Sequence, residues 1–490
     1  QQIKIKMNKI LSIVSALLFS VSVLQSQNTT LFEKKTSGFT INGNIKNLAD
    51  TSVILAYYFG GKQYATDTTD VVNGQLTFSG DKALGGGIYL LVLPDGKYFE
   101  LIISEQKFSF TTDKNDLVQS MRFQNSRENT AFYEYLNYIT EKQNEVSPLK
   151  AKQSNAKSEE EKEKIQQEIA KVDEDVRSYR NIFNNKYPNV FFSKIIRATT
   201  DIKIPETPLD STGKPKENFQ FYYYKKHFWD NMDFSDQRML RTPIFFNKMD
   251  QYLEKLSPKH PDSIIVSADI MIEKARANKD VFQYVVSYIT STYERSKIMG
   301  MDAVFVHMVE KYYITGECDW VKEKQLKKII ERANRISPNM IGKKPLNLVF
   351  KDTLDKYHSL YHLQAKYTLL FFYDPDCAHC KKEAPKIKTV CDSLVEAGID
   401  IKVFAVTTEF DIEKWKEFIK KSDIGNWINV GDIQFDEEGN PVATSNWREQ
   451  YDIHSTPVIY LLNKDKEIIA KRINDKQIVK IIEREESLEE

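Results

Sequence analysis

The chain has 490 residues, and its 69 lysines and arginines balance its 69 aspartates and glutamates, so the formal net charge is zero. At about 100–200 residues per domain, this length predicts two to four domains. The balanced charge argues against nucleic acid or an anionic membrane surface as a general partner. The chain has only 4 cysteines, and so few in so long a chain exclude a disulfide-stabilised scaffold.

Residues 1–27 have the pattern of a secretory signal peptide. Lysines flank Met7, an apolar run extends from Ile10 to Leu24, and polar residues follow. This order of basic, apolar and polar regions is typical of an export signal. The apolar run is shorter than the roughly 18–20 residues of a membrane-spanning helix, and an uncleaved N-terminal membrane anchor is the alternative. We therefore expect the mature protein in the periplasm.

Residues 37–113 are predicted to form a small all-β, sandwich-like domain. Phe39 and Ile41 alternate with polar residues, as on a strand with one buried face. Asn73-Gly74 separates two short apolar segments and is a strong signal for a tight hairpin. Short strands with turns at a spacing of about 8–12 residues are typical of a sandwich or barrel.

Residues 126–337 are predicted to form an α-helical middle domain. An apolar stripe with alternating spacings of four and three residues runs from Ile165 to Tyr179, as on one face of a helix. The proline-containing segment Thr199–Asn218 is predicted to be a loop or linker. The many aromatic residues of this block are expected to form its core, and none of its motifs indicates chemistry.

The last block, residues 342–486, alternates strands and helices. The predicted strands are Tyr367–Tyr373, Ile399–Val406, Val458–Leu462 and Glu467–Lys471, and the predicted helices are Cys380–Glu396, Asp411–Lys421 and Asp475–Glu486. This β-α-β-α-β-β-α order predicts a thioredoxin fold, with helices on both faces of a central sheet. The whole chain is therefore predicted to be multidomain, with a small all-β N-terminal domain, an α-helical middle domain and a C-terminal α/β thioredoxin fold.

Cys377 and Cys380 are the predicted catalytic pair. They come directly after the first strand of this block and open a helix, where unpaired backbone N–H groups and the helix dipole favour a thiolate. Cys377 is expected to attack a substrate disulfide, and Cys380, shielded in the first helical turn, to resolve the mixed disulfide. His379 lies between them and either adds positive charge beside the thiolate or is a loop histidine without effect.

The other uses of these cysteines are less well supported by the sequence. A C-x-x-C pair can be half of a zinc site, but a structural zinc needs four ligands, and the chain has no second C-x-x-C. We therefore expect neither a metal nor a cofactor.

Cys391 lies about three helical turns, roughly 16 Å, beyond Cys380, which is too far for a disulfide. Cys391 and Cys318 are expected to be buried packing residues.

A second signal lies at Thr456-Pro457, immediately before the predicted strand Val458–Leu462. In the thioredoxin layout a proline at this point is expected in cis, an isomer found in only about 5–6% of X–Pro bonds. The cis bond would bring the backbone of Thr456 beside Cys377, where an extended substrate chain can pair with it. An ordinary trans proline at the start of a strand is the alternative.

These motifs resemble those of the TlpA/ResA-like thiol–disulfide oxidoreductases, a thioredoxin-like family. Asp374–Pro385 is similar to their active-site segment, and Ser455–Pro457 is similar to their cis-proline loop. The resemblance implies that Glu383 lies near the cysteine pair and helps to move protons. A partly buried carboxylate can accept the proton of the resolving thiol, and a surface glutamate is the alternative.

The resemblance extends upstream but is incomplete. Val71–Gly80 resembles the small N-terminal domain fused to such modules in Bacteroidota, and His227–Asn231 and Ile298–Asp302 resemble the helical middle domain of some of these proteins. The dipeptide between the cysteines is Ala-His and not the Glu-Pro often seen in cytochrome-maturation reductases, and Phe371 stands where thioredoxin buries an acidic residue. These departures leave the redox potential and the natural partner open.

Taken together, the motifs predict an exported enzyme that reduces disulfides of envelope proteins and receives electrons from a membrane donor. The alternative is a non-catalytic envelope binding or scaffold protein that uses the thioredoxin module for recognition. The cysteine pair, Pro457 and Glu383 together favour the enzyme. A peroxiredoxin-like peroxidase is disfavoured, because such enzymes need a threonine three positions before the reactive cysteine, where this chain has Asp374.

Overall fold

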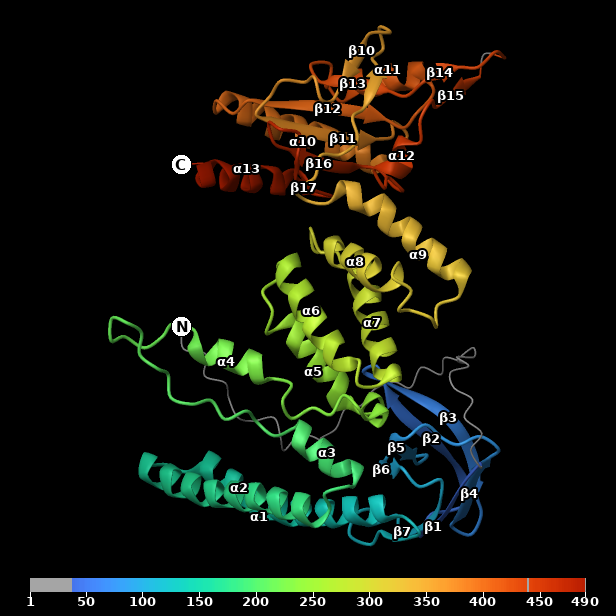
Figure 1. The fold of residues 1–490 in the computed structure, drawn as a ribbon, viewed down its shortest axis with the longest axis vertical. Coiled ribbons are helices and arrows are strands. Elements are labelled where there is room, and N and C mark those ends of the chain that lie inside the picture. The colour runs from blue at the N-terminus through green and yellow to red at the C-terminus, as the bar shows by residue number, and fades with distance from the viewer. Residues whose placement is uncertain (1–37, 439, 490) are drawn as a thin grey trace. The chain divides into compact units, whose positions relative to one another are not determined.

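The structure is a computed structural model that describes residues 38–438 and 440–489 (Figure 1). It divides into two compact units. Unit 1 contains the chain up to Leu256 together with Lys274–Val281, and unit 2 contains Ser257–Glu273 and the chain from Phe282 onward. The predicted signal peptide lies outside the described residues. Among the helices that are described, none is both long and apolar enough to cross a membrane.

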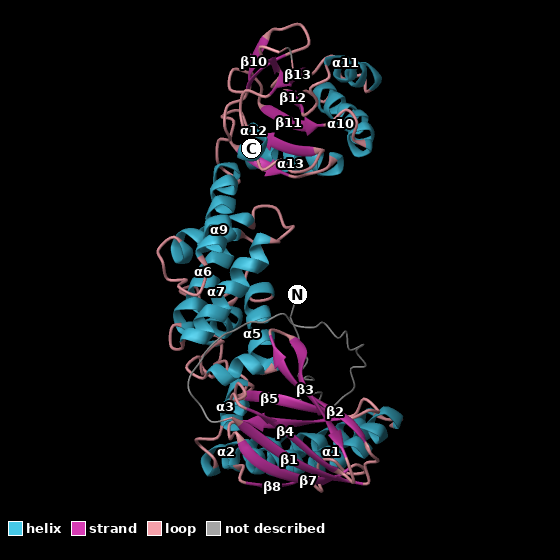
Figure 2. Ribbon diagram, turned by 90° about the vertical axis from the view of Figure 1, so that its right-hand side faces the viewer, coloured by secondary structure: helices cyan, strands magenta, loops and turns pink. Residues whose placement is uncertain are grey.

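The described strands of unit 1 form two four-stranded sheets with the orders β4-β1-β7-β8 and β3-β2-β5-β6 (Figure 2). Neighbouring strands are antiparallel except for β1 and β7, which run parallel. The bounds are β1 (Phe39–Lys46), β2 (Thr51–Phe59), β3 (Lys62–Val71), β4 (Gln75–Gly80), β5 (Gly87–Val92), β6 (Tyr98–Ile103), β7 (Lys107–Asp113) and β8 (Arg122–Gln124). Strand β8 lies beyond residue 113, where the predicted β domain ends, because a three-residue strand is too short to show alternation.

The hairpin predicted at Asn73-Gly74 is confirmed. Val72 and Gln75 exchange backbone hydrogen bonds of 3.0 and 2.9 Å across the turn, and Asn73 and Gly74 have φ values of 51° and 76°. Two successive positive φ values define the turn that matches the twist of a two-residue hairpin. A Cβ at Gly74 would lie 2.6 Å from the carbonyl oxygen of Ile45, so the turn requires glycine for space as well as for conformation.

The helices of unit 1 begin with a long pair, α1 (Arg127–Asn155) and α2 (Glu159–Lys186), which lie side by side (Figure 1). The hydroxyls of Ser126 and Ser158 cap their first turns, as serine does at many helix starts. Much of the stripe predicted from Ile165 to Tyr179 is buried in α2. The remaining elements are α3 (Phe191–Ala198), α4 (Phe219–His227), η1 (Gln237–Arg241) and α5 (Pro243–Glu254).

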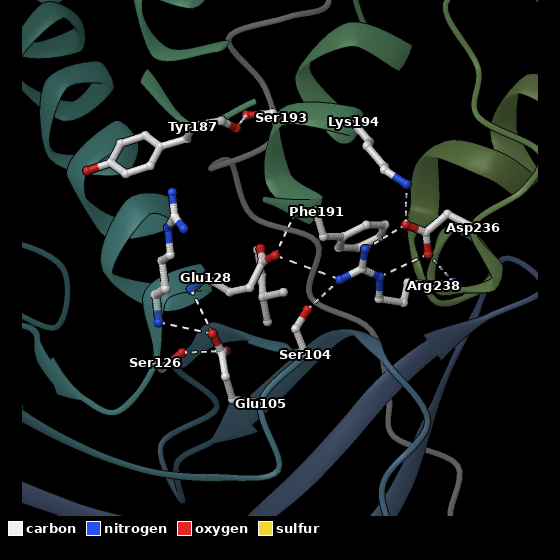
Figure 3. A network of polar contacts seen from close by, with 12 residues as sticks. Ser104, Glu105, Ser126, Glu128, Tyr187, Phe191, Ser193, Lys194, Asp236 and Arg238 are labelled. Carbon is white, nitrogen blue, oxygen red and sulfur yellow. Dashed lines mark hydrogen bonds and ion pairs between the residues drawn. The ribbon is translucent and has the colours of Figure 1, made fainter. Parts of the chain in front are cut away.

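A buried ion cluster around Arg238 joins the sheet and helices of unit 1 (Figure 3). The guanidinium donates to the Asp236 carboxylate at 2.6 and 2.9 Å and to the Ser104 hydroxyl at 2.7 Å. It also lies 3.7 Å from Glu128, whose carboxylate accepts the Phe191 N–H at 2.6 Å. Charges removed from water in this way are stable when opposite charges and hydrogen-bond donors surround them, so the cluster links the residue after β6, the start of α1, α3 and η1 to one another.

The first elements of unit 2 are helical. They are α6 (Pro261–Ala275), α7 (Lys279–Glu294), α8 (Asp302–Met308), the π-helical turn η2 (Val309–Tyr313), α9 (Glu323–Ile336) and the 3-10 turn η3 (Ser337–Asn339). The end of α6 and the start of α7 belong to unit 1. The predicted helical block, residues 126–337, therefore contributes to both units, and its last helices belong to the same unit as the C-terminal sheet.

The C-terminal domain is built on one sheet with the order β10-β9-β13-β12-β11-β16-β17. Strand β11 is parallel to β12 and antiparallel to β16. The strands are β9 (Val349–Lys351), β10 (Tyr357–Ser359), β11 (Tyr367–Tyr373), β12 (Ile401–Thr407), β13 (Ile428–Gly431), β16 (Val458–Leu462) and β17 (Ile468–Lys471), and the helices are α10 (Ala378–Glu396), α11 (Ile412–Lys421), α12 (Trp447–Gln450) and α13 (Asp475–Glu489).

Both faces of this sheet are covered, which explains the continuous apolar sequence of β11. Leu369, Phe371 and Tyr373 pack under α10, α11 and α13. Leu370 and Phe372 face α12 and the segments around β9 and β10. All seven residues of β11 are buried, as expected for a strand in the middle of a two-sided sheet. The predicted fold class, an all-β region, a helical region and a C-terminal α/β thioredoxin-like domain, is confirmed.

The predicted element order omits β9 and β10, which precede β11, and also a segment later in this domain. Between α11 and β16 the structure adds β13, the small hairpin of β14 (Gln434–Phe435) and β15 (Pro441–Val442), and α12. The sequence did not predict them because each has four residues or fewer, which is shorter than the repeats that reveal strands and helices. This added segment lies beside the candidate site described next.

Candidate active site

Cys377 lies at the start of α10, at the end of the central strand β11. A turn that begins at Asp374 makes the connection: the Asp374 carboxylate accepts the Asp376 N–H at 2.8 Å, and the Asp374 carbonyl accepts the Cys377 N–H at 3.1 Å. Cys377 is the N-cap residue, and α10 begins at Ala378, two residues before its predicted start at Cys380. The thiol therefore lies at the end of the helix where backbone N–H groups are unpaired.

The surroundings of Cys377 favour its thiolate. Burial of this half-buried side chain opposes ionisation, but the backbone N–H and the thiol of Cys380 and the backbone N–H of His379 outweigh it, so the pKa of Cys377 is lowered. Hydrogen bonds to the charged form and the helix dipole act in the same direction. Cys377 thus has the properties of an attacking nucleophile.

Cys380 has the opposite character. Its side chain is completely buried, and burial, together with the neighbouring Cys377, raises the pKa of its thiol to about 12. The Asp374 N–H donates to its sulfur at 3.4 Å, but this contact does not compensate for desolvation. Cys380 is therefore a protonated thiol that solvent does not reach, which is the state expected of a resolving cysteine before it is needed.

The predicted loop at Pro457 lies beside the nucleophile. The Thr456–Pro457 bond is cis, as predicted. The Cys377 thiol donates to the Thr456 carbonyl oxygen at 3.4 Å, and both Thr456 and Pro457 are half-buried. The backbone of Thr456 therefore lies next to Cys377, at the place where the sequence predicts that a substrate chain pairs.

The side chains of the two remaining predicted site residues, Glu383 and His379, do not contact the cysteine pair among the described interactions. The Glu383 carboxylate forms an ion pair of 2.8 Å with Lys386, and within the described residues it is hydrogen-bonded to that lysine and not to either cysteine. The His379 side chain is exposed, and it is the backbone N–H of this residue that lowers the pKa of Cys377. The structure thus brings together Cys377, Cys380, Thr456 and Pro457.

A recess of about 250 Å³ at the ends of β12 and β13 was not predicted. Its first residues lie beside the connection between β11 and Cys377. The Thr408 N–H donates to the Tyr373 carbonyl at 2.8 Å, and the Glu409 carboxylate lies within 4.8 Å of those of Asp374 and Asp376. Its far side is formed by the added segment, including Asp432 and Trp447. The only signal in the sequence was a tryptophan within an otherwise polar stretch.

The two cysteines outside the pair are packing residues, as predicted. Cys318 and Cys391 are 4% and 5% exposed. Burial is the leading cause that raises the pKa of each to about 12. Neither is available as a thiolate near neutral pH.

Three parts of the chain match models of known families. Residues 341–471 match the AhpC/TSA family, whereas residues 39–132 and 150–339 match two domains of unknown function, DUF4369 and DUF5106. None of the functionally curated proteins matches significantly.

Several solved structures are similar. A domain of a possible thiol-disulfide isomerase from Cytophaga hutchinsonii has 38% identity, and the match covers 31% of this chain and 98% of that one, with a TM-score of 0.27. A thioredoxin-like protein from Bacteroides caccae has 21% identity over 56% of this chain and 97% of that one, with a TM-score of 0.42. The thioredoxin domain of a thiol-disulfide oxidoreductase from Bacteroides vulgatus has 22% identity over 29% and 96%, with a TM-score of 0.25.

The sheet order, the paired thiols at the start of α10 and the family match define a thioredoxin-like redox domain. Residues 341–471 therefore form a thioredoxin-like domain of the AhpC/TSA family, and the two matched domains of unknown function upstream fit the predicted multidomain layout.

Proposed function

We propose that the protein is an exported thiol–disulfide oxidoreductase that reduces disulfides of envelope proteins, with Cys377 as the nucleophile and Cys380 as the resolving thiol. The observation that carries the proposal is the opposite shift of the two pKa values, lowered for Cys377 and raised to about 12 for Cys380. An accessible thiol with a lowered pKa at a helix start, next to a buried thiol that stays protonated, is the arrangement expected of an attacking cysteine and its resolving partner.

In the first step the Cys377 thiolate attacks one sulfur of a substrate disulfide. The S–S bond of the substrate breaks, a bond forms between Cys377 and that sulfur, and the second substrate sulfur leaves as a thiolate. The Thr456 backbone beside Cys377 can hold an extended substrate chain by β-type hydrogen bonds. The recess next to Asp376 and Glu409 offers room for a neighbouring side chain.

In the second step Cys380 attacks the sulfur of Cys377. The mixed disulfide breaks, a Cys377–Cys380 disulfide forms, and the other substrate sulfur is released, so the substrate gains two electrons and two protons and the enzyme loses them. With a pKa of about 12, Cys380 must lose its proton as it attacks, and a departing substrate thiolate can accept this proton. The step therefore requires no metal or cofactor.

Turnover requires a dithiol donor that reduces the Cys377–Cys380 disulfide. We propose a membrane electron donor for this role, because the pattern of residues 1–27 indicates export and a periplasmic enzyme is cut off from cytoplasmic reductants. The protein substrates are accordingly disulfide-containing envelope proteins, in keeping with the oxidising compartments in which disulfides persist.

Reduction of insulin with dithiothreitol as the electron source tests this function. The wild-type chain is expected to accelerate precipitation of the insulin B chain, and Cys377→Ser is expected to abolish the effect. Cys391→Ser is the matched control, because this cysteine is on the same helix but packs in the core, and it should retain activity. Full activity of Cys377→Ser would refute the proposal and leave the binding protein as the better explanation.

A further inference from the structure

The Asp452 carboxylate binds several basic side chains, at the point where helix α9 contacts the loop that leads to Pro457. The residue is 5% exposed and follows α12 in the added segment of the C-terminal domain. Its carboxylate binds Arg332 of α9, Arg472 at 2.7 Å and the ring nitrogen of His454 at 2.9 Å. All of these residues belong to unit 2.

Side chains also bind the backbone at the N-terminal end of this loop. Three successive carbonyl oxygens each accept a hydrogen bond from a side chain: Gln450 from Asn339, Tyr451 from Tyr460 at 3.0 Å, and Asp452 from Arg472 at 3.0 Å. Asn339 follows α9 in η3. Two side chains from the helical segment, those of Arg332 and Asn339, therefore bind consecutive parts of the loop.

The position of Asp452 is unusual in both conformation and charge. Its φ is 55°, a region that costs most non-glycine residues energy and that aspartate tolerates better than most. A carboxylate so deeply buried is stable only when cations or hydrogen-bond donors surround it. Arg332 and Arg472 supply the two permanent charges, so the loss of either weakens the conformation of the loop.

The loop ends at the nucleophile. Two residues beyond His454, the Thr456 carbonyl accepts the Cys377 thiol at 3.4 Å. Only three residues thus separate Asp452, which binds Arg332, from Thr456, whose carbonyl contacts the Cys377 sulfur. Displacement of this segment by even 1 Å is of the size that can cost about a hundredfold in a reaction that depends on orientation.

We propose that Asp452 is a positioning residue for the Thr456 backbone and that Arg332 of helix α9, by binding Asp452, contributes to the geometry of the redox site. Arg332 fixes Asp452, Asp452 fixes the turn at His454, and the turn sets the backbone of Thr456 for pairing with a protein substrate. This inference rests on the proposed disulfide exchange. It assigns the last helix of the DUF5106 region, residues 150–339, a role in substrate pairing.

A second ion pair between the same parts of unit 2 provides the control. Lys471 is 6% exposed and binds Asp302 of α8 and the carbonyl oxygen of Asn339. Asp302 binds Lys471 and makes no hydrogen bond, among the described residues, to the loop from Gln450 to Thr456. Asp302→Asn therefore weakens the packing between these parts without removing a partner of Asp452.

The test compares two substrates in full-length wild-type protein, Arg332→Ala, Arg332→Lys and Asp302→Asn. On this proposal insulin, a protein substrate, depends on pairing with the Thr456 backbone, whereas a small aromatic disulfide has no peptide backbone to pair and reaches Cys377 without it. The ratio of the two kcat/KM values does not depend on how much of the protein is folded. Mutations within a coupling network change such quantities by roughly two- to thirtyfold, and we expect Arg332→Ala to lower the insulin-to-small-disulfide ratio within this range.

Arg332→Lys keeps the charge and is expected to recover part of the ratio, which also keeps the test decisive if the alanine variant does not fold. Asp302→Asn should lower the melting temperature and leave the ratio unchanged. The inference is overturned if Arg332→Ala keeps the wild-type ratio, or if Asp302→Asn lowers it as much. A wild-type protein that reduces neither substrate would refute the proposed function itself, which is a different result.

Discussion

Alkylation of each active-site thiol as a function of pH tests the opposite pKa shifts on which the proposed function depends. Iodoacetamide reacts with the thiolate, so its rate follows ionisation. In Cys380→Ser the reactive group is Cys377, and in Cys377→Ser it is Cys380. Cys318 and Cys391 contribute little in either variant, because both are buried and their pKa values are about 12.

The size of the effect follows from the surroundings of Cys380. Burial is the leading cause that raises the pKa of this thiol from 9.0 to about 12, and burial does not depend on Cys377. This rise lowers the thiolate fraction near neutral pH about a thousandfold, which corresponds to about 4 kcal/mol in favour of the thiol. We therefore expect Cys380 to remain unreactive from about pH 6 to pH 9 in the folded Cys377→Ser protein.

Cys377 should behave in the opposite way. Its pKa lies below the ordinary value of 9.0, so the alkylation rate of Cys380→Ser should level off with a midpoint below that pH. Mass spectrometry of quenched samples identifies the modified cysteine, and unfolding in urea should make Cys380 as reactive as a free cysteine. A midpoint above 9.0 for Cys377, or rapid alkylation of Cys380 in the folded protein, would refute the reasoning.

Two further predictions concern the ion cluster of unit 1. Arg238→Ala leaves Asp236 and Glu128 buried without their shared partner and should lower the free energy of unfolding by about 3–5 kcal/mol. Arg177→Ala is the control: this residue is 58% exposed, and its loss should change the free energy of unfolding by less than about 0.5 kcal/mol. Equal effects of the two substitutions in urea unfolding would contradict the account. Burial opposes ionisation of Asp236, but Arg238 and Lys194 outweigh it and lower its pKa from 3.8 to about 2. Because the folded-state pKa is the lower one, the stabilisation, about 2 kcal/mol, is present above pH 3.8 and is lost as the pH falls toward 2. The destabilisation caused by Asp236→Asn should therefore shrink over that range, and a cost that is constant with pH would disprove it.

Local patterns in the sequence predicted the parts of the molecule whose causes are local. The uninterrupted apolar run of β11 marks a strand covered on both faces, and Asn73-Gly74 marks a hairpin because few other residues tolerate its backbone angles. The position of Cys377 at a helix start followed from the strand directly before it. In each case residues close together in the sequence were sufficient to predict the element.

The features that the sequence did not reveal depend on residues far apart in the chain. Arg332 and Asp452 are 120 positions apart, and neither lies in a motif. The added segment from β13 to α12 consists of elements too short to show a repeat. The ion pair between Glu383 and Lys386 also depends on rotamers that sequence spacing does not fix, so the role implied for Glu383 stays a prediction.

Trapping of a mixed disulfide tests the central claim most directly. Cys380→Ser protein, reduced and then exposed to a disulfide-containing protein substrate, should accumulate a covalent complex linked through Cys377, because the resolving thiol is gone. Peptide mapping by mass spectrometry identifies the linked cysteine, and Cys377→Ser should form no such complex. A complex linked through Cys318 or Cys391, or the absence of any complex in Cys380→Ser, would contradict the assignment of Cys377 as the nucleophile.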